Sequence, residues 1–250
     1  MKKFLIIFFL PIILFFACAT QKSQVKVKSE VPKADFDIYF REGITFLSQG
    51  DYEKAVRSFK NALIINPSSP RVHNLLGISY FQLKDYKNAE KQFNETISLD
   101  SSYAQAYSNL GSLYFITKKF DEAEQMLKKA ISISPQLISP YYTLGTLLLY
   151  QNRFEEGYSY LSKGISLDPN YLDKHKSFIT NFSSPAFGSA EIYFSFAKLY
   201  ASIGNIEKTL EYLKKAKRAG FRDWHRIKED KDFEKVINNP KIKAFIQNLK

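Results

Sequence analysis

The residue types that most often carry catalysis or bind metals are scarce in this 250-residue chain and form no familiar motif. Its three histidines, His73, His175 and His225, are far apart. Its one cysteine, Cys18, excludes an internal disulfide or a cluster of thiolate ligands. The sequence contains no phosphate-binding glycine loop, no H-E-x-x-H and no G-x-S-x-G. We therefore expect no catalytic residues, no metal site and no cofactor, and we predict that the protein is not an enzyme.

The N-terminus has the composition of a targeting signal. Lys2 and Lys3 precede an apolar run of 13 residues (4–16), and small residues follow it. At 1.5 Å per residue a helix of this run spans about 20 Å, whereas a bilayer core is roughly 30 Å thick. The length therefore favours a secretory signal over the alternative of an uncleaved membrane anchor.

The cysteine follows this apolar run and a small residue, Ala17. The segment resembles the lipobox of bacterial lipoproteins, although Phe15 stands where Leu is usual. The resemblance implies a signal peptide of residues 1–17 and a mature N-terminus at Cys18, whose thiol carries fatty acyl chains such as palmitate. Ala19 is not the Asp that retains lipoproteins at the inner membrane, so an outer-membrane, periplasm-facing location is expected. An ordinary cleavage site at Ala17-x-Ala19 is the alternative.

The net charge of +11 is unevenly distributed. The signal carries +2 and residues 20–33 carry +3, which makes residues 18–35 a polar, lysine-rich tether after the anchor cysteine. Residues 34–206 carry 17 basic and 17 acidic side chains, and residues 207–250 carry a net +6. A neutral central region argues against a nucleic-acid partner. The C-terminal lysines are either solvated or contact anionic lipid headgroups.

The central region is an internal repeat with a period of 34 residues. Glycines recur at 43, 77, 111 and 145, with an aromatic residue nine positions after each, a small residue twelve after and a large apolar residue sixteen after. Each period contains an amphipathic helix, a polar turn and a second helix. A hairpin of this kind buries its apolar face only by stacking on its neighbours, which predicts an all-α solenoid.

These repeats resemble the tetratricopeptide repeat (TPR) family, which implies a right-handed α-solenoid of stacked helix-turn-helix hairpins. Repeat three carries the full eight-position signature, from Tyr107 to Pro135. Repeat one has Glu42 where Leu is usual, and repeat two departs at His73, Thr96 and Ser101. The TPR domain is expected over 36–223, with repeats at 36–69, 70–103, 104–137, 138–171 and 190–223 and an insertion at 172–189. Residues 224–250 resemble a TPR end-of-group helical cap.

TPR proteins usually bind partners on the concave surface formed by the first helix of each repeat. Carried onto this chain, those positions are neutral-polar, apolar or aromatic apart from Arg71, and the Lys/Arg clamp for acidic C-termini is absent. The resemblance therefore implies a groove that binds a protein or peptide. The predicted partner-binding residues are Asn74, Ile78, Phe81, Ser108, Asn109, Ser112, Phe115, Tyr142 and Thr146. For Phe81 and Phe115 the alternative is packing between the helices.

The resulting hypothesis is a non-enzymatic protein-protein interaction adaptor or assembly scaffold, tethered to a bacterial envelope membrane by its N-terminal lipid. TPR lipoproteins that help pilus secretins assemble and those that recruit peptidoglycan hydrolases are both comparable, and the sequence does not choose between them. The alternative is an envelope enzyme accessory or carbohydrate-related protein with its site in the 172–189 insertion. That insertion contains His175 and three phenylalanines.

Overall fold

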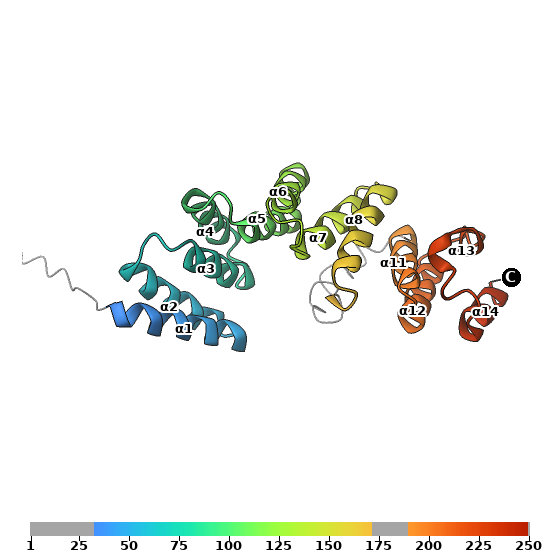
Figure 1. The fold of residues 1–250 in the computed structure, drawn as a ribbon, viewed down its shortest axis with the longest axis horizontal. Helices are drawn as coiled ribbons and strands as arrows, with labels where there is room; N and C mark the ends of the chain where they lie inside the picture. Colours follow the sequence, from blue (N-terminus) through green and yellow to red (C-terminus); the bar gives the residue numbers. More distant parts are fainter. Residues whose placement is uncertain (1–32, 172–189, 250) are drawn as a thin grey trace, which may run out of the picture. The chain divides into compact units, whose positions relative to one another are not determined.

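The structure, a computed structural model, describes residues 33–171 and 190–249, all of which belong to the unit Pro32–Lys250. These residues form helices and turns and include no strand (Figure 1). The signal, Cys18, His175 and the 172–189 insertion lie outside the described residues. The all-α fold predicted from the sequence is confirmed.

Ten helices of the described residues form five helix-turn-helix hairpins. We call the first helix of each hairpin the A helix and the second the B helix. The A helices are α1 (Lys33–Gln49), α3 (Pro70–Gln82), α5 (Ala104–Ile116), α7 (Ser139–Tyr150) and α11 (Ala190–Ser202). The B helices are α2 (Tyr52–Ile65), α4 (Tyr86–Leu99), α6 (Phe120–Ile133), α8 (Phe154–Leu167) and α12 (Ile206–Arg218).

Helix α1 begins earlier than the sequence suggests. It starts at Lys33, so residues 33–35 belong to the first hairpin rather than to the tether. Asp35 lies in the first turn, where a negative charge is favourable beside the helix N-terminus. Phe36, directly after Asp35, and Phe40, one turn later, stack with ring centroids 5.9 Å apart. Both rings pack against the core of the first hairpin and so fix the start of the helix.

The turn within each hairpin places one residue in the left-handed region of the backbone. These residues are also 34 positions apart in the first four hairpins, and the fifth has Gly204. Glycine adopts positive φ without steric cost, but a lysine there is strained. The φ angles are 78° at Gly50, 60° at Lys84, 62° at Lys118, 61° at Asn152 and 77° at Gly204.

The periodic glycines lie where the two helices of a hairpin touch. A Cβ atom built on Gly111 would be 2.6 Å from the Leu127 side chain, and one on Gly77 would be 2.6 Å from the Phe93 ring. At Gly145 the same atom would also be 2.8 Å from the Gly157 carbonyl oxygen. The sequence period of the glycines therefore reports close helix crossing inside each hairpin.

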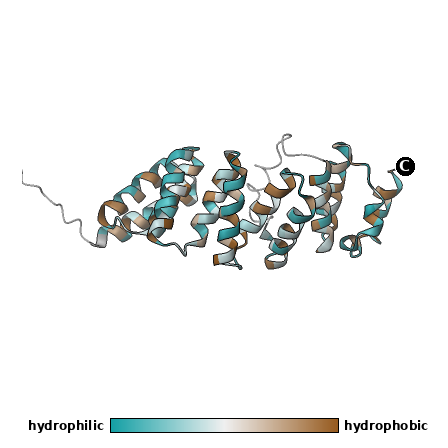
Figure 2. Ribbon diagram, turned by 90° about the horizontal axis from the view of Figure 1, so that it is seen from above, coloured by the Kyte–Doolittle hydropathy of each residue, from teal (hydrophilic) through white to brown (hydrophobic). Residues whose placement is uncertain are grey.

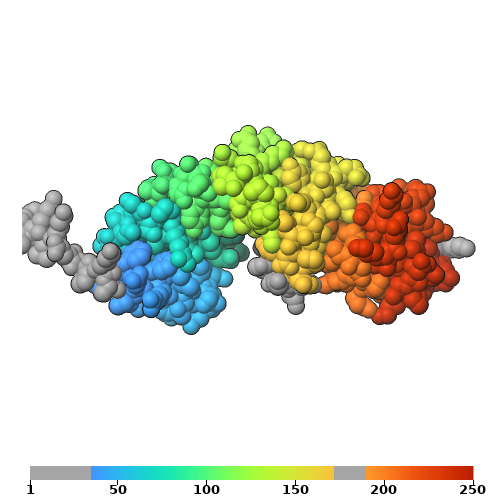
Figure 3. All heavy atoms as spheres, viewed as in Figure 1, coloured from blue at the N-terminus to red at the C-terminus, as the bar shows by residue number. Residues whose placement is uncertain are grey.

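Successive hairpins stack through contacts of each B helix with the next A helix, at α2–α3, α4–α5 and α6–α7. In the space-filling view the colours follow one another in sequence order, as expected when each hairpin touches its neighbours (Figure 3). Hydrophobic and hydrophilic residues are mixed along the helices, which agrees with burial on one side only (Figure 2).

The first hairpin explains the unusual Glu42. In repeats two to four the residue at this position is Leu76, Leu110 or Leu144, and all three are buried against the preceding B helix. Glu42 is exposed instead and accepts a hydrogen bond from Ser58. A polar residue suits the first A helix of the described solenoid because this face does not stack on an earlier described hairpin.

Three short elements follow the fifth hairpin: α13 (Arg226–Glu229), the 3₁₀ turn η2 (Lys231–Phe233) and α14 (Pro240–Gln247). Phe221 stacks on Phe194 of α11 with ring centroids 4.2 Å apart, and Phe233 packs on the same ring at 5.7 Å. The Asn239 side chain accepts from the Lys241 backbone N–H and starts α14. This C-terminal segment (residues 219–249) thus shares one hydrophobic core with α11 and α12.

Candidate functional site

The A helices of repeats two, three and four lie next to one another and present a chain of side-chain amides. Asn109 of α5 donates from Nδ2 to Asn74 Oδ1 of α3 at 2.9 Å. Gln105 Nε2 donates to Asn109 Oδ1 at 3.0 Å. Asn74 is buried, whereas Gln105 and Asn109 are half-buried. The chain thus fixes Asn109 from both sides and leaves amide groups at the surface.

Hydroxyl groups continue this polar row from α5 to α7. The Ser108 and Ser139 Oγ atoms are 3.0 Å apart, and the side-chain oxygens of Ser112 and Thr143 are 3.5 Å apart. Thr146 donates back to the carbonyl of Tyr142 at 2.8 Å, within its own helix. The row therefore joins three successive A helices through neutral polar side chains.

The structure divides the nine predicted partner-binding residues into two groups. Four are half-buried: Ile78, Phe81, Asn109 and Ser112. Five are buried, with exposed fractions of 0–3%: Asn74, Ser108, Phe115, Tyr142 and Thr146.

The burial of Tyr142 corrects the expectation that its ring contacts a partner, and the burial of Phe115 favours the alternative that its ring packs between helices. The Tyr142 ring is fully buried, stacks on Tyr171 with centroids 5.0 Å apart, and lies against the α8 backbone at Gly164. Burial raises the pKa of both the Tyr142 and the Tyr171 phenols. Phe115 packs in the core with Phe120 and Tyr150. Both rings stabilise the solenoid, so their truncation reports on folding before it reports on binding.

One apolar residue of this surface was missed in the sequence. Ile116, next to the buried Phe115, is 37% exposed at the end of α5. The groove positions of the family end at Phe115 in this repeat, so the family pattern does not include Ile116. We define the A-face surface as the half-buried Gln105, Asn109 and Ser112 together with Ile78 and Ile116.

In the fifth hairpin the corresponding position is already engaged. Lys198 of α11 is equivalent to Ser112, and its ammonium lies 2.8 Å from Asp230 and 3.5 Å from Asp232 in the C-terminal segment. It also lies 4.1 Å from the centroid of the Tyr158 ring. Burial acts to raise the pKa of Asp230, but the Lys198 hydrogen bond and the Asp232 backbone N–H outweigh it and hold that pKa below its usual value. This part of α11 therefore binds the chain's own C-terminal segment.

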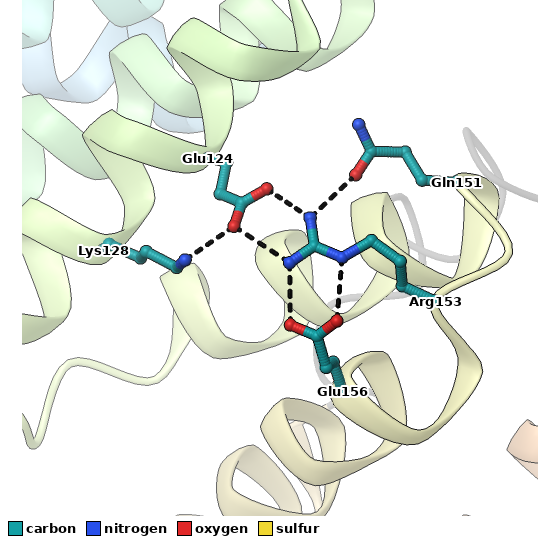
Figure 4. Close-up of polar contacts among 5 residues, drawn as sticks. All are labelled: Glu124, Lys128, Gln151, Arg153 and Glu156. Carbon is teal, nitrogen blue, oxygen red and sulfur yellow. Dashed lines mark hydrogen bonds and ion pairs between the residues drawn. The ribbon is translucent and has the colours of Figure 1, made fainter.

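A second polar network joins repeats three and four on the B helices (Figure 4). Arg153, in the turn before α8, forms ion pairs with Glu124 of α6 at 2.6 Å and with Glu156 at 2.7 Å. Glu124 also pairs with Lys128 at 2.6 Å. The Arg153 hydrogen bond holds the pKa of Glu124 below its usual value. Two positive and two negative side chains are thus paired with one another. This network, which we call the inter-repeat clamp, joins repeats three and four and has the character of a structural contact, not of a catalytic group.

The two histidines in the described residues have structural surroundings. His73 is buried, with Nε2 2.9 Å from the Pro67 carbonyl and Nδ1 2.7 Å from Gln92. His225 is exposed beside Asp223 at 2.8 Å. Within the described residues there is no group of three or more His, Cys, Asp or Glu side chains placed to hold a metal ion. Nor is any helix in that part of the chain long and apolar enough to cross a membrane.

Comparison with known proteins now identifies the repeat. Family models described as tetratricopeptide repeats match residues 43–84, 68–136, 138–171 and 190–219, which is more than half of the chain. The chain belongs to the TPR family. Among curated proteins no match was found.

Several solved structures share this fold. TTC0263, a thermophilic TPR protein of Thermus thermophilus, is 16% identical, with 86% of this chain and 98% of that chain covered and a TM-score of 0.54. A MamA fragment from Desulfovibrio magneticus RS-1 is 19% identical, with 74% and 94% covered and a TM-score of 0.51. Another MamA structure is 22% identical, with 78% and 96% covered and a TM-score of 0.51.

Proposed function

We propose that this TPR protein is a protein-binding adaptor or assembly scaffold, and that the A-face surface binds an extended peptide of its partner. The observation that carries the proposal is the amide chain Gln105–Asn109–Asn74, which crosses from one A helix to the next. A primary amide both donates and accepts, as a peptide backbone does, so a row of amides matches an extended chain. Membership of a family that binds proteins through this surface supports the proposal.

The chemistry of the surface favours a neutral partner segment. Its five residues carry no charge, and Ile78 and Ile116 supply apolar contact on either side of the amides. A charged ligand group would lose hydration here without gaining an opposite charge, which costs free energy. We infer that the bound segment has small polar and apolar side chains.

A photo-crosslinking pair tests this assignment in the cell. A benzoylphenylalanine at Ile116, which is 37% exposed on the A face, should crosslink a partner protein, whereas one at Gln125, an exposed residue of the B helix α6, should not. Asn109→Ala should remove the crosslink at position 116. Equal crosslinking at both positions, or a crosslink that is insensitive to Asn109→Ala, would place the partner elsewhere.

The membrane anchor is a separate part of the proposal. We propose that Cys18 is the acylated N-terminus and that it holds the protein on the periplasmic side of a bacterial envelope membrane, the outer one in preference to the inner. Several acyl chains at about 0.8 kcal/mol per buried methylene suffice for firm anchoring. Intact-mass spectrometry should find acylated Cys18, and Cys18→Ser should release the protein from membranes. A mature N-terminus at Thr20 would contradict the anchor and leave the A-face assignment standing.

A further inference from the structure

The B-helix side of repeats one and two has a hollow of about 500 Å³. Its apolar lining comes from Leu63 and Ile64 of α2 and from Leu76 and Tyr80 of α3. Ile64 is 70% exposed, the highest value among the large apolar residues of the described chain. An apolar hollow with an apolar residue at its rim is a surface on which a partner gains free energy by excluding water.

The other repeats show what this hollow lacks. Gln92 lines it, and the equivalent residues 34 and 68 positions later are Met126 and Tyr160. Met126 packs against the core cluster of α4 and α5, and Tyr160 packs against that of α6 and α7. Apolar or aromatic side chains of the protein itself therefore occupy this position in repeats three and four, while repeat two has a polar one that is smaller than the tyrosine of repeat four.

A second residue that lines the hollow also differs between repeats two and four. His73 lines the hollow where repeat four has Tyr141. The Tyr141 hydroxyl donates to the Pro135 carbonyl at 3.0 Å, and His73 Nε2 makes the equivalent contact with Pro67 at 2.9 Å. The Tyr141 and Tyr160 rings lie 6.4 Å apart, whereas His73 Nδ1 contacts Gln92. Repeat two thus keeps the side-chain contact with the proline carbonyl that repeat four has, but it lacks the pair of aromatic rings found there.

The rim of the hollow favours a negative charge. Lys60 on α2 and Lys91 on α4 line the hollow from two different helices, and Glu95 is the one acidic residue of the lining. The Lys60 ammonium is 5.7 Å from the centroid of the Tyr80 ring. No ion pair involves Lys60 or Lys91 among the described residues. A carboxylate near the two ammonium groups would form charge-assisted hydrogen bonds that the described residues do not supply.

We propose that this hollow is a second docking site, at which a segment of a partner protein inserts one aromatic side chain flanked by a carboxylate. The aromatic ring takes the place of the Tyr160 ring of repeat four, and the carboxylate meets Lys60 and Lys91. The site lies on the B helices and does not depend on the A-face surface. A partner could therefore occupy it while a peptide occupies the A face.

Peptide probes test the site on the full chain. Acetyl-Asp-Tyr-Asp-amide should bind, and the peptides with Ala for Tyr or with Asn for Asp should bind more weakly. Gln92→Tyr copies repeat four and fills the hollow from within, so it should keep the fold and weaken the first peptide at least about tenfold, a loss typical of a blocked anchor pocket. Gln82→Tyr, an exposed site on the A helix, is the matched control and should leave binding unchanged.

Several outcomes would overturn the proposal. These are no binding of the tyrosine peptide to the wild-type chain, equal binding to the Gln92→Tyr chain, or equal binding of the peptide that lacks the ring. Binding of free 3-(4-hydroxyphenyl)propanoate without binding of the peptide would assign the hollow to a small molecule instead. If Gln92→Tyr fails to fold, Lys60→Glu with Lys91→Glu serves in its place. That pair should abolish the preference for the Asp peptide over the Asn peptide, and retention of the preference would contradict the proposal.

Discussion

The close helix crossing at Gly111 makes a quantitative prediction about stability. A Cβ atom at this position would lie 2.6 Å from Leu127 Cγ and 3.3 Å from the Ala123 carbonyl oxygen. An ordinary contact is 3.4 Å or more, so Gly111→Ala forces an overlap of nearly 1 Å. Leu127 is fully buried, so its side chain cannot relieve the overlap by turning out into solvent. The two helices of the hairpin must therefore move apart.

Two opposing terms set the size of the effect. Overpacking a core by one methyl group costs about 1–3 kcal/mol, and the better helix propensity of alanine returns about 1 kcal/mol. We expect Gly111→Ala to reduce the free energy of unfolding by up to about 2 kcal/mol. Gly145→Ala should cost more, because its Cβ also meets the Gly157 carbonyl oxygen at 2.8 Å and a backbone atom cannot turn aside.

The test is a double-mutant cycle measured by urea unfolding with circular dichroism. Leu127→Ala alone should cost about 2–5 kcal/mol, because it leaves a cavity. Added to that background, Gly111→Ala meets no Cγ atom, so its effect should change sign and stabilise the chain by about 1 kcal/mol through helix propensity. If Gly111→Ala destabilises both backgrounds equally, the overlap with Leu127 does not explain the periodic glycine.

Three further predictions concern the turns, the inter-repeat clamp and the first helix. Lys118→Gly should raise the free energy of unfolding by up to about 1 kcal/mol, because glycine removes the strain of a positive φ, and a lower midpoint in urea would refute this. Breaking the Glu124–Arg153 pair should reveal a coupling of about 1 kcal/mol in a double-mutant cycle. Because the pKa of Glu124 is lower in the folded than in the unfolded state, this stabilisation is present above the unfolded pKa of about 4.3 and is lost as the pH falls through the folded pKa. Glu124→Gln should therefore make the free energy of unfolding depend less on pH below about pH 5. Glu42→Leu should join the exposed Ile38 into an apolar patch and increase self-association in sedimentation, whereas an unchanged sedimentation coefficient would show that this face is covered.

The helical repeat could be predicted from the sequence because its cause is local and periodic. The 34-residue spacing of Gly77 and Gly111 reflects the same contact in each hairpin, with Phe93 and Leu127 respectively. The sequence shows which residues depart from the repeat pattern, but it does not show why. Glu42 becomes understandable only once its exposed face is seen, and His73 only beside Gln92.

The binding surface was harder to predict because burial there depends on neighbouring repeats. The fifth residue of one repeat contacts the second residue of the next, as Ser108 of repeat three contacts Ser139 of repeat four. The family positions therefore mark residues near the concave side without showing which of them a neighbour covers. The Glu124–Arg153 clamp joins residues 29 positions apart, and Glu90–Lys119, with a 3.7 Å ion pair, has the same spacing. That recurrence is a sequence signal that could have revealed the clamp.

The most direct test of the central claim is the affinity of a peptide selected from a random display library on the full chain, with excess acetyl-Asp-Tyr-Asp-amide present to occupy the hollow of repeats one and two. The account predicts that selected peptides are neutral and that Asn109→Ala weakens them by about 1–2 kcal/mol, a loss typical of a contact that carries binding energy. Replacing Lys214, Lys215 and Lys217 with Glu should leave the affinity unchanged. Raising salt from about 0.05 to 0.5 M should also have little effect, because screening acts on charges. Selection of acidic peptides whose affinity falls with salt and follows the α12 lysines would contradict the claim that the A-face surface is the binding site.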